Sequence, residues 1–185
     1  GHFFLDMSSH KPIVLIGGGV GLTPVLSMLN AVVESGSQRE THFFYGVVCG
    51  ADHAFKEHLQ NIARENENIH LHVCYSRPAD DDVGGEDYQH GEFVSVDLFK
   101  RLLASNNYEF YICGPPPMMT SLVEGLKAWN VSEECIHFEA FGPASVKKKM
   151  DDGTKESASG GPALNVNFAR SDKSVSWHAE AGSIL

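Results

Sequence analysis

The sequence predicts an α/β fold: a doubly wound, five-stranded parallel sheet of strand order 3-2-1-4-5, with helices on both faces, followed by a C-terminal β-hairpin. Strand-like and helix-like segments alternate over residues 12–140. A glycine-rich turn joins the first strand-like segment to the first helix-like one. After residue 143 the composition changes, and two short segments follow in which apolar and polar residues alternate. Parallel neighbours need right-handed crossovers, so the alternation favours a sheet that is covered on both faces.

The first unit consists of a strand, a glycine turn and a helix. Residues 12–16 are an unbroken apolar run typical of a buried strand, and residues 17–21 ("GGGVG") hold four glycines in five positions. Thr23 is a suitable helix N-cap, Pro24 suits the first helical position, and apolar residues then recur at helical spacing. Bare backbone beside a helix N-terminus lets a pyrophosphate approach closely, which predicts nucleotide binding.

The later segments continue the alternation. We expect strands at 41–48, 69–75, 108–113 and 136–140, and helices after Asp52, over 96–104 and over 118–129. Asp52 is a suitable N-cap, and Phe55, Leu59 and Ile62 would share one side of its helix. The polar segment 76–92 predicts a loop or mobile hairpin. Ligands of such sheets bind beyond the carboxyl ends of the strands, where the glycine turn lies.

Beyond residue 143 the chain changes character. Residues 144–162 are rich in Lys, Asp, Ser and Gly, which predicts a flexible linker. Apolar residues then alternate at 164, 166 and 168 and again at 175 and 177, with a turn at Ser171 and Asp172. A lone hairpin is marginally stable in water, so residues 163–185 are interpreted as the first piece of a second domain.

Charge limits the classes of partner. The formal net charge is −10, and residues 147–149 are the only basic run. Nucleic-acid binding depends on clustered cations, so we expect no nucleic-acid partner. The sequence has no run of about 20 apolar residues and no signal-peptide pattern. We therefore expect a cytoplasmic protein without a membrane partner.

Metal-binding patterns are not evident. The chain has four cysteines, Cys49, Cys74, Cys113 and Cys135. Each lies in or at the end of a β-like run and none forms a Cys-x-x-Cys pair, which favours reduced, largely buried thiols. His70 and His72 alternate on one face of a strand, and His53 and His58 share a helix too loosely to define ligands. We expect no metal site.

Five segments together resemble a known family. They are "GGGVGLTP", the expected turn at Tyr45 and Gly46, "YSRP", "YICGPPPMM" and "IHFEAFGP". Their order and spacing resemble the NAD(P)H-binding domain of the ferredoxin reductase family over residues 12–143. Pro24 stands where the general dinucleotide fingerprint has a third glycine, and this family carries a proline there. The domain, linker and hairpin together resemble the phthalate dioxygenase reductase arrangement of flavin, nicotinamide and plant-type [2Fe–2S] ferredoxin domains.

The resemblance implies domain boundaries. Residues 1–10 would be the tail of a missing flavin-binding domain, 11–143 the NAD(P)H-binding domain, 144–162 the linker and 163–185 the N-terminal fragment of a ferredoxin-like domain. The parent would be an NAD(P)H-dependent flavin and iron–sulfur oxidoreductase. This fragment would be inactive alone. Its partners would be the flavin and ferredoxin domains and a downstream electron acceptor, such as an oxygenase component.

Two alternatives remain open. Flavohaemoglobin-type nitric oxide dioxygenases share "GVGLTP" and "FGP" but have no ferredoxin tail. A non-catalytic nucleotide-sensing module would use the same turn without electron transfer. The implied cofactors are NADH or NADPH, FAD or FMN in the missing flavin domain, and a [2Fe–2S] cluster in the missing C-terminal part.

The resemblance also assigns site residues. Cys113 would lie against the nicotinamide ring and orient it rather than act as a nucleophile, and Glu139 and Phe141 would lie next to the flavin. Ser76 and Arg77 would meet the adenosine ribose or its 2′-phosphate. The expected catalytic residues are Cys113 and Glu139. The expected cofactor-binding residues are Gly17, Gly18, Gly19, Val20, Gly21, Leu22, Thr23, Pro24, Ser76, Arg77, Cys113, Gly114, Pro115, Pro116, Met118 and Phe141.

Charges near Arg77 bear on the choice of nucleotide. Reductases of this family that require NADPH usually add a Lys and a Tyr shortly after the Arg. Here Tyr88 is present, but no Lys occurs between Arg77 and Lys100. The acidic run at 80–82 would repel a 2′-phosphate. These observations favour NADH.

Overall fold

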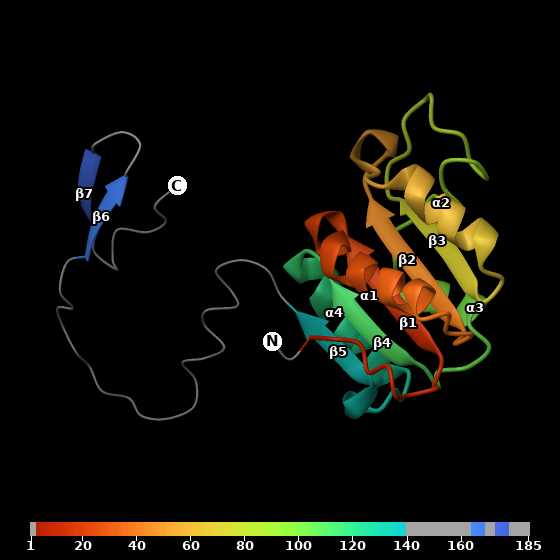
Figure 1. Cartoon of the computed structure of the whole chain (residues 1–185). Helices are drawn as coiled ribbons and strands as arrows, with labels where there is room; N and C mark the ends of the chain where they lie inside the picture. Colours follow the sequence, from red (N-terminus) through yellow and green to blue (C-terminus); the bar gives the residue numbers. More distant parts are fainter. Residues whose placement is uncertain (1–2, 140–163, 169–172, 178–185) are drawn as a thin grey trace. The chain divides into compact units, whose positions relative to one another are not determined.

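The computed structural model describes residues 3–139, 164–168 and 173–177. The chain divides into two compact units, residues 1–148 and 149–185. The first unit contains the following elements (Figure 1): β1 (Ile13–Gly18), η1 (Gly19–Gly21), α1 (Leu22–Glu34), β2 (Thr41–Val47), η2 (Gly50–Asp52), α2 (Lys56–Glu65), β3 (Ile69–Tyr75), α3 (Val96–Leu102), β4 (Glu109–Cys113), α4 (Pro116–Ala128), η3 (Glu133–Cys135) and β5 (Ile136–Glu139). The η elements are single 3₁₀ turns.

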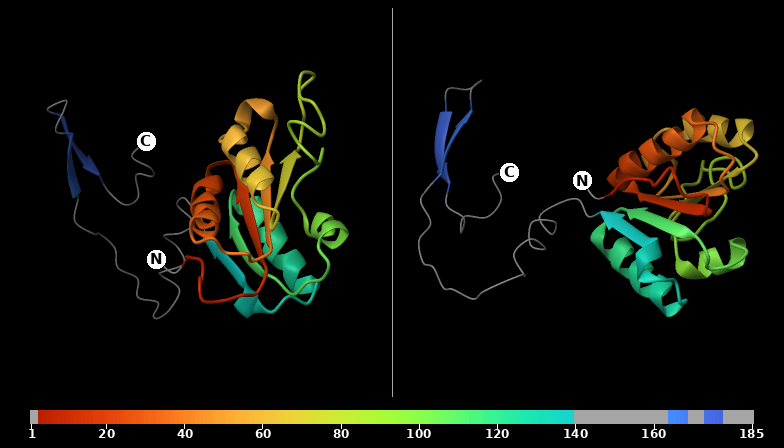
Figure 2. Two further views of the ribbon diagram at one scale, coloured as in Figure 1. Left: turned by 45° about the vertical axis from the view of Figure 1, so that its right-hand side comes forward. Right: turned by 60° about the horizontal axis from the view of Figure 1, so that its bottom comes forward.

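All five strands of this unit pair in parallel in the order β3-β2-β1-β4-β5, which confirms the predicted fold class. Helices α1 and α2 cover one face, and α3 and α4 cover the other (Figures 1 and 2). Side chains alternate between two cores because successive strand residues point to opposite faces. Leu15 and Phe43 pack on the α1 side, and Ile16 and Phe44 pack on the α3 side.

Two expected N-caps are wrong. Helix α1 begins at Leu22, because the chain passes from the 3₁₀ turn η1 directly into the helix with Gly21 already in a right-handed helical conformation. Thr23 therefore lies inside the helix, where its hydroxyl donates to the Val20 carbonyl at 3.3 Å. Asp52 ends η2 and does not cap α2, which begins at Lys56.

Three further local expectations also need correction. Phe55 precedes α2 in the left-handed conformation, with φ 57°, and is 54% exposed, so it does not share the buried side of Leu59 and Ile62. The expected turn at Tyr45 and Gly46 is part of β2, where both residues pair with β3. Helix α4 begins at Pro116, before Met118, because proline suits the first helical turn.

The segment after β3 returns along the outer edge of that strand. The Tyr75 amide donates to the His90 carbonyl at 2.9 Å, and the Val73 amide donates to the Gln89 side-chain oxygen at 2.8 Å. Cys74 and His90 form a parallel bridge. The predicted loop thus pairs with the edge strand of the sheet.

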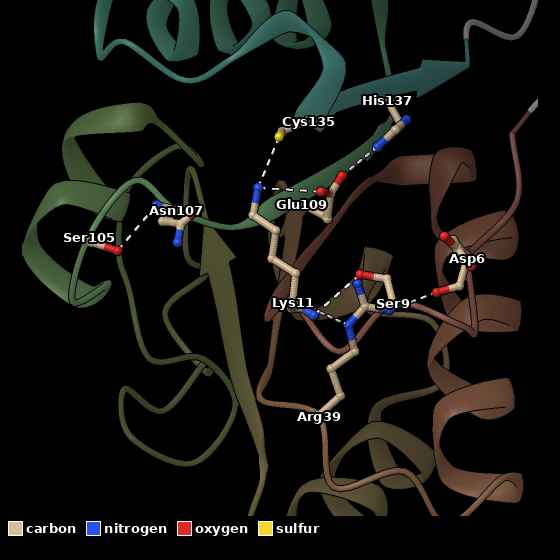
Figure 3. Close-up of polar contacts among 9 residues, drawn as sticks. All are labelled: Asp6, Ser9, Lys11, Arg39, Ser105, Asn107, Glu109, Cys135 and His137. Atoms are coloured by element: carbon tan, nitrogen blue, oxygen red, sulfur yellow. Dashed lines mark hydrogen bonds and ion pairs between the residues drawn. The ribbon is translucent and has the colours of Figure 1, made fainter.

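The N-terminal segment packs on the same unit. Phe3 and Leu5 contact the core beneath α1. The buried Arg39 side chain donates to the carbonyls of Asp6, at 3.0 Å, and Lys11. Figure 3 shows these groups beside the start of β4, where the Lys11 ammonium lies 3.3 Å from Glu109 Oε1. The same ammonium lies 2.9 Å from Cys135 Sγ. That residues 1–10 form the tail of a flavin domain stays a prediction.

The second unit contains the antiparallel pair β6 (Leu164–Phe168) and β7 (Lys173–Trp177). The hairpin strands are therefore present, with Leu164 opposite Trp177. The expected linker at 144–162 and turn at 171–172 lie outside the described residues.

The four cysteines are free thiols, but only Cys74 and Cys113 are buried. In the described part of the chain, no helix has the length and apolar character needed to span a membrane.

Candidate functional site

A cleft of about 940 Å³ opens at the carboxyl edge of the sheet. Its wall combines the glycine turn and start of α1, the ends of β2 and β3, residues 92–95 and the start of α4. Strand β1 leads to α1 on one face of the sheet, and the neighbouring β4 leads to α4 on the other. The cleft therefore lies where the strand order reverses, which is the usual ligand position in open α/β sheets.

The expected site residues divide into those that line this cleft and those that do not. The lining residues are Gly18, Gly19, Val20, Leu22, Thr23, Ser76, Pro115 and Met118. The residues outside its wall are Gly17, Gly21, Pro24, Arg77, Cys113, Gly114, Pro116 and Glu139. Phe141 lies outside the described residues.

The glycines of the turn serve different purposes. Gly19 has φ +51° and lines the cleft, and a Cβ there would meet no atom within 4 Å. A Cβ on Gly18 would lie 2.5 Å from Met118 Sδ. A Cβ on Gly21 would overlap the Cys113 carbonyl and lie 2.5 Å from the Gly114 nitrogen. Gly18 and Gly21 therefore allow the turns after β1 and β4 to pack together, while Gly19 presents bare backbone to the cleft.

Two helices begin at the cleft. Helices α1 and α4 have 13 residues each, and neither has a side-chain cap on its N-terminus. The positive end of each helix dipole therefore faces the ligand space. In the first turn of α1 the Leu22 N–H donates to the Gly19 carbonyl and Pro24 has no N–H, and in α4 Pro116 and Pro117 have none, so both helices act mainly through their dipoles. Among the described residues of the wall none is Lys or Arg, so the backbone is the source of positive potential.

The cleft wall is apolar over much of its area. Val20 is 82% exposed, Phe93 75% and Phe55 54%, and all three line the cleft. Exposed apolar side chains at a cleft are suited to flat ring systems. Phe93 and Phe55 were missed by sequence reasoning, because nothing in the sequence distinguishes a cleft phenylalanine on a loop from a core one.

Strand pairing places Cys113 between Gly17 of β1 and Glu139 of β5. The Cys113 side chain is fully buried. Burial, and secondarily the Glu139 charge, raises the pKa of the Cys113 thiol to about 11, so the thiol is neutral at physiological pH. A neutral, buried thiol is unsuited to nucleophilic attack, and the orienting role of Cys113 stays a prediction.

Ser76 and Arg77 extend the pairing of β3 with β2. Their amides donate to the carbonyls of Val47, at 3.0 Å, and Val48, at 2.9 Å. Ser76 lines the cleft, whereas Arg77 is exposed and lies outside its wall. Two acids, Asp52 and Glu92, line the same cleft, and Glu92 forms an ion pair with Arg101. The structure thus brings the Ser, but not the Arg, to the cleft.

A parallel 3-2-1-4-5 sheet with a bare glycine turn and an uncapped helix N-terminus at its switch point defines a dinucleotide-binding α/β domain. Residues 15–124 match the oxidoreductase NAD-binding domain family, and the chain belongs to this family.

Curated relatives include flavohemoproteins. The chain is 38% identical over 144 residues to that of Halalkalibacterium halodurans, a match that covers 78% of this chain and 35% of the relative. It is 36% identical over 143 residues to that of Rhizobium meliloti, with 77% of this chain and 35% of the relative covered. The chain therefore spans about a third of the length of these relatives.

Solved structures show the same fold. The flavohem-like FAD/NAD-binding domain of nitric oxide dioxygenase from Vibrio cholerae has a TM-score of 0.64 and 28% identity, covering 77% of this chain and 56% of the other. The Amycolatopsis reductase GcoB has a TM-score of 0.66 and 28% identity, covering 78% of this chain and 43% of the other. These likenesses agree with the assignment of the chain to the oxidoreductase NAD-binding domain family.

Proposed function

We propose that this chain is the nicotinamide-nucleotide part of a flavin-dependent electron-transfer reductase, and that NADH is its preferred nucleotide. The observation that carries the proposal is the bare backbone of Gly19 beside the uncapped N-terminus of α1, both facing one cleft. When bound, NADH supplies a hydride, and the redox chemistry belongs to the nucleotide and the flavin. The contribution of this chain is binding and orientation.

Each part of the cleft has a role in this proposal. The Gly19 backbone admits the pyrophosphate, and the dipole of α1 stabilises its charge. The exposed faces of Phe55 and Phe93 offer contact area to the flat rings of the nucleotide. The buried Cys113, between Gly17 and Glu139, holds the edge of β4 against which the nicotinamide would lie.

Charge on the cleft wall supports NADH over NADPH. Asp52 and Glu92 line the cleft, while Arg77 lies outside its wall. Glu92 is already paired with Arg101, so a 2′-phosphate would chiefly meet the Asp52 carboxylate without a cation in the wall to pair with, whereas a ribose hydroxyl could donate a hydrogen bond to it. Asp52→Asn tests this directly. We expect the variant to bind NADPH about tenfold more tightly, with smaller effect on NADH.

The proposal also concerns which redox centre receives electrons from the flavin. Hairpin β6–β7 supports an arrangement with a flavin domain before this one and a [2Fe–2S] ferredoxin domain after it, serving an acceptor such as an oxygenase. The flavohemoprotein relatives favour a second candidate, in which the flavin reduces a globin haem.

Two measurements test the proposal. Calorimetry on the 185-residue chain should detect one NADH site, and the purified chain should be colourless and should not reduce ferricyanide with NADH. Absence of NADH binding would refute the nucleotide assignment. Bound flavin with turnover would refute the domain boundaries. In the full-length polypeptide, iron with acid-labile sulfide supports the ferredoxin arrangement, a haem Soret band supports the globin one, and absence of flavin would indicate a sensing module.

A further inference from the structure

A cluster of ionisable side chains lies at the opposite edge of the sheet from the cleft. Glu40 directly precedes β2, and His42 and His70 are partners near the amino ends of β2 and β3. One potential ligand atom from each of these three residues lies within 4.8 Å of the other two. Glu40 Oε1 is 3.0 Å from His42 Nε2, and the His42 and His70 ring centroids are 4.7 Å apart. A carboxylate and two imidazoles therefore converge on one point.

The side chains of these three residues differ in burial. His42 is buried, whereas Glu40 and His70 are exposed. The site thus has one anchored donor and an open side toward water.

Outer partners hold the donors in place. The Tyr108 hydroxyl donates to Glu40 Oε1 at 3.0 Å. His42 Nδ1 lies 3.1 Å from His72 Nε2, and His72 Nδ1 lies 3.5 Å from His90 Nε2. Which ring nitrogen donates in each contact depends on the tautomers of the three imidazoles. With an ion on its Nε2, His42 would carry its proton on Nδ1 and donate it to His72, as metal-ligating histidines commonly donate to an outer partner.

We propose that Glu40, His42 and His70 bind a divalent transition-metal ion. Zn²⁺ is the ion that fits these three donors best, with a water molecule as its fourth ligand. Two imidazoles and a carboxylate are suitable donors for Zn²⁺, which accepts four ligands at about 2.0–2.2 Å. Because the site joins β2 to β3 at the edge away from the cleft, the ion would stabilise the sheet rather than take part in electron transfer. The proposal departs from the expected absence of a metal site, because the register of two strands, and no short motif, brings these residues together.

Metal titration of the 185-residue chain tests the proposal. Calorimetry with Zn²⁺ should show one saturable site, Co²⁺ should give visible absorption bands of a low-symmetry site, and Zn²⁺ should raise the melting temperature. His70→Gln and Glu40→Gln each replace an exposed ligand and should weaken Zn²⁺ binding at least about tenfold. Tyr108→Phe keeps all three ligands but removes the hydrogen bond to Glu40, and should weaken binding by about tenfold.

His58→Gln is the matched control, since His58 is an exposed histidine on α2, hydrogen-bonded to Asn30. It should bind Zn²⁺ as the parent does, and all variants should keep the parent circular-dichroism spectrum. Failure of the parent to bind Zn²⁺ saturably would overturn the proposal. So would equal affinity in the parent and His70→Gln, or equal loss in His58→Gln, because the ion would then be bound elsewhere.

Discussion

Replacing Gly21 with Ala should destabilise the domain, whereas replacing Gly19 with Ala should weaken NADH binding at a smaller cost in stability. The reason is the environment of each Cα. A methyl group on Gly21 would overlap the Cys113 carbonyl and approach the Gly114 nitrogen, and these are backbone atoms that cannot rotate away. A methyl group on Gly19 would point into open space in the cleft, where we place the pyrophosphate.

The expected magnitudes differ enough to separate the two effects. Forcing a methyl group into a packed site costs about 1–3 kcal/mol, and the rigid neighbours of Gly21 place its cost near about 3 kcal/mol. Gly19 has φ +51°, a conformation that costs Ala about 1–2 kcal/mol. At roughly 2–4 °C per kcal/mol, Gly21→Ala should lower the melting temperature by about 6–12 °C. Gly19→Ala should weaken NADH binding at least about tenfold, equivalent to about 1.4 kcal/mol.

Urea unfolding and NADH calorimetry on both variants measure these effects. Gly19→Asn is the matched control for backbone strain, because Asn tolerates a left-handed conformation but still adds a Cβ. It should recover most of the stability lost in Gly19→Ala and none of the affinity. If the unfolding free energy of the Gly21→Ala variant lies within about 0.5 kcal/mol of that of the parent, the usual range of a neutral substitution, the packing argument is refuted. An unchanged NADH dissociation constant in Gly19→Ala would refute the position of the pyrophosphate.

Phe93→Ala should weaken NADH binding several-fold without changing the melting temperature, because the ring is 75% exposed and lines the cleft; calorimetry and thermal denaturation check both. Arg77→Ala should leave NADH affinity at low salt within about threefold of the parent, and a parent preference for NADPH that vanishes in the variant would make Arg77 a 2′-phosphate ligand. Burial, aided by the Lys56 charge, lowers the pKa of His53 to about 4. The unfolded chain therefore takes up a proton at His53 that the folded chain excludes between about pH 6.5 and 4, and this one group should lower the unfolding free energy on acidification by up to about 1.4 kcal/mol per pH unit. His53→Leu should reduce this slope in urea titrations.

The parallel sheet was predictable because its strands carry their own signal. A strand buried on both faces is a near-continuous apolar run, as residues 13–16 and 43–45 are. The four crossovers of the sheet were visible in the sequence as alternating strand-like and helix-like segments. The glycine turn was equally clear, since few other positions need so much bare backbone. The helix starts at Leu22 and Lys56 were missed because an N-cap depends on the backbone conformation of the preceding turn, which tertiary contacts set.

Less of the site could be predicted. Local motifs located Gly19 and Ser76 at the cleft, but they also assigned nucleotide contact to Gly21, whose constraint comes from β4, almost 100 residues later. Phe93 reaches the cleft from a loop without a motif. The pairing of His42 with His70 depends on strand register, which the sequence specifies only through the alternation of both strands together.

The return of residues 89–90 along β3 has a consequence for how copies of this protein behave in concentrated solution. An outer strand with unpaired N–H and C=O groups is a template for a strand of another molecule, and aggregation can grow from it. Here the amides of Val73 and Tyr75 already donate to Gln89 and His90 of the same chain. The loop that helps to build the cleft thus also protects one margin of the sheet, and shortening it would expose a row of backbone groups suited to intermolecular β-pairing.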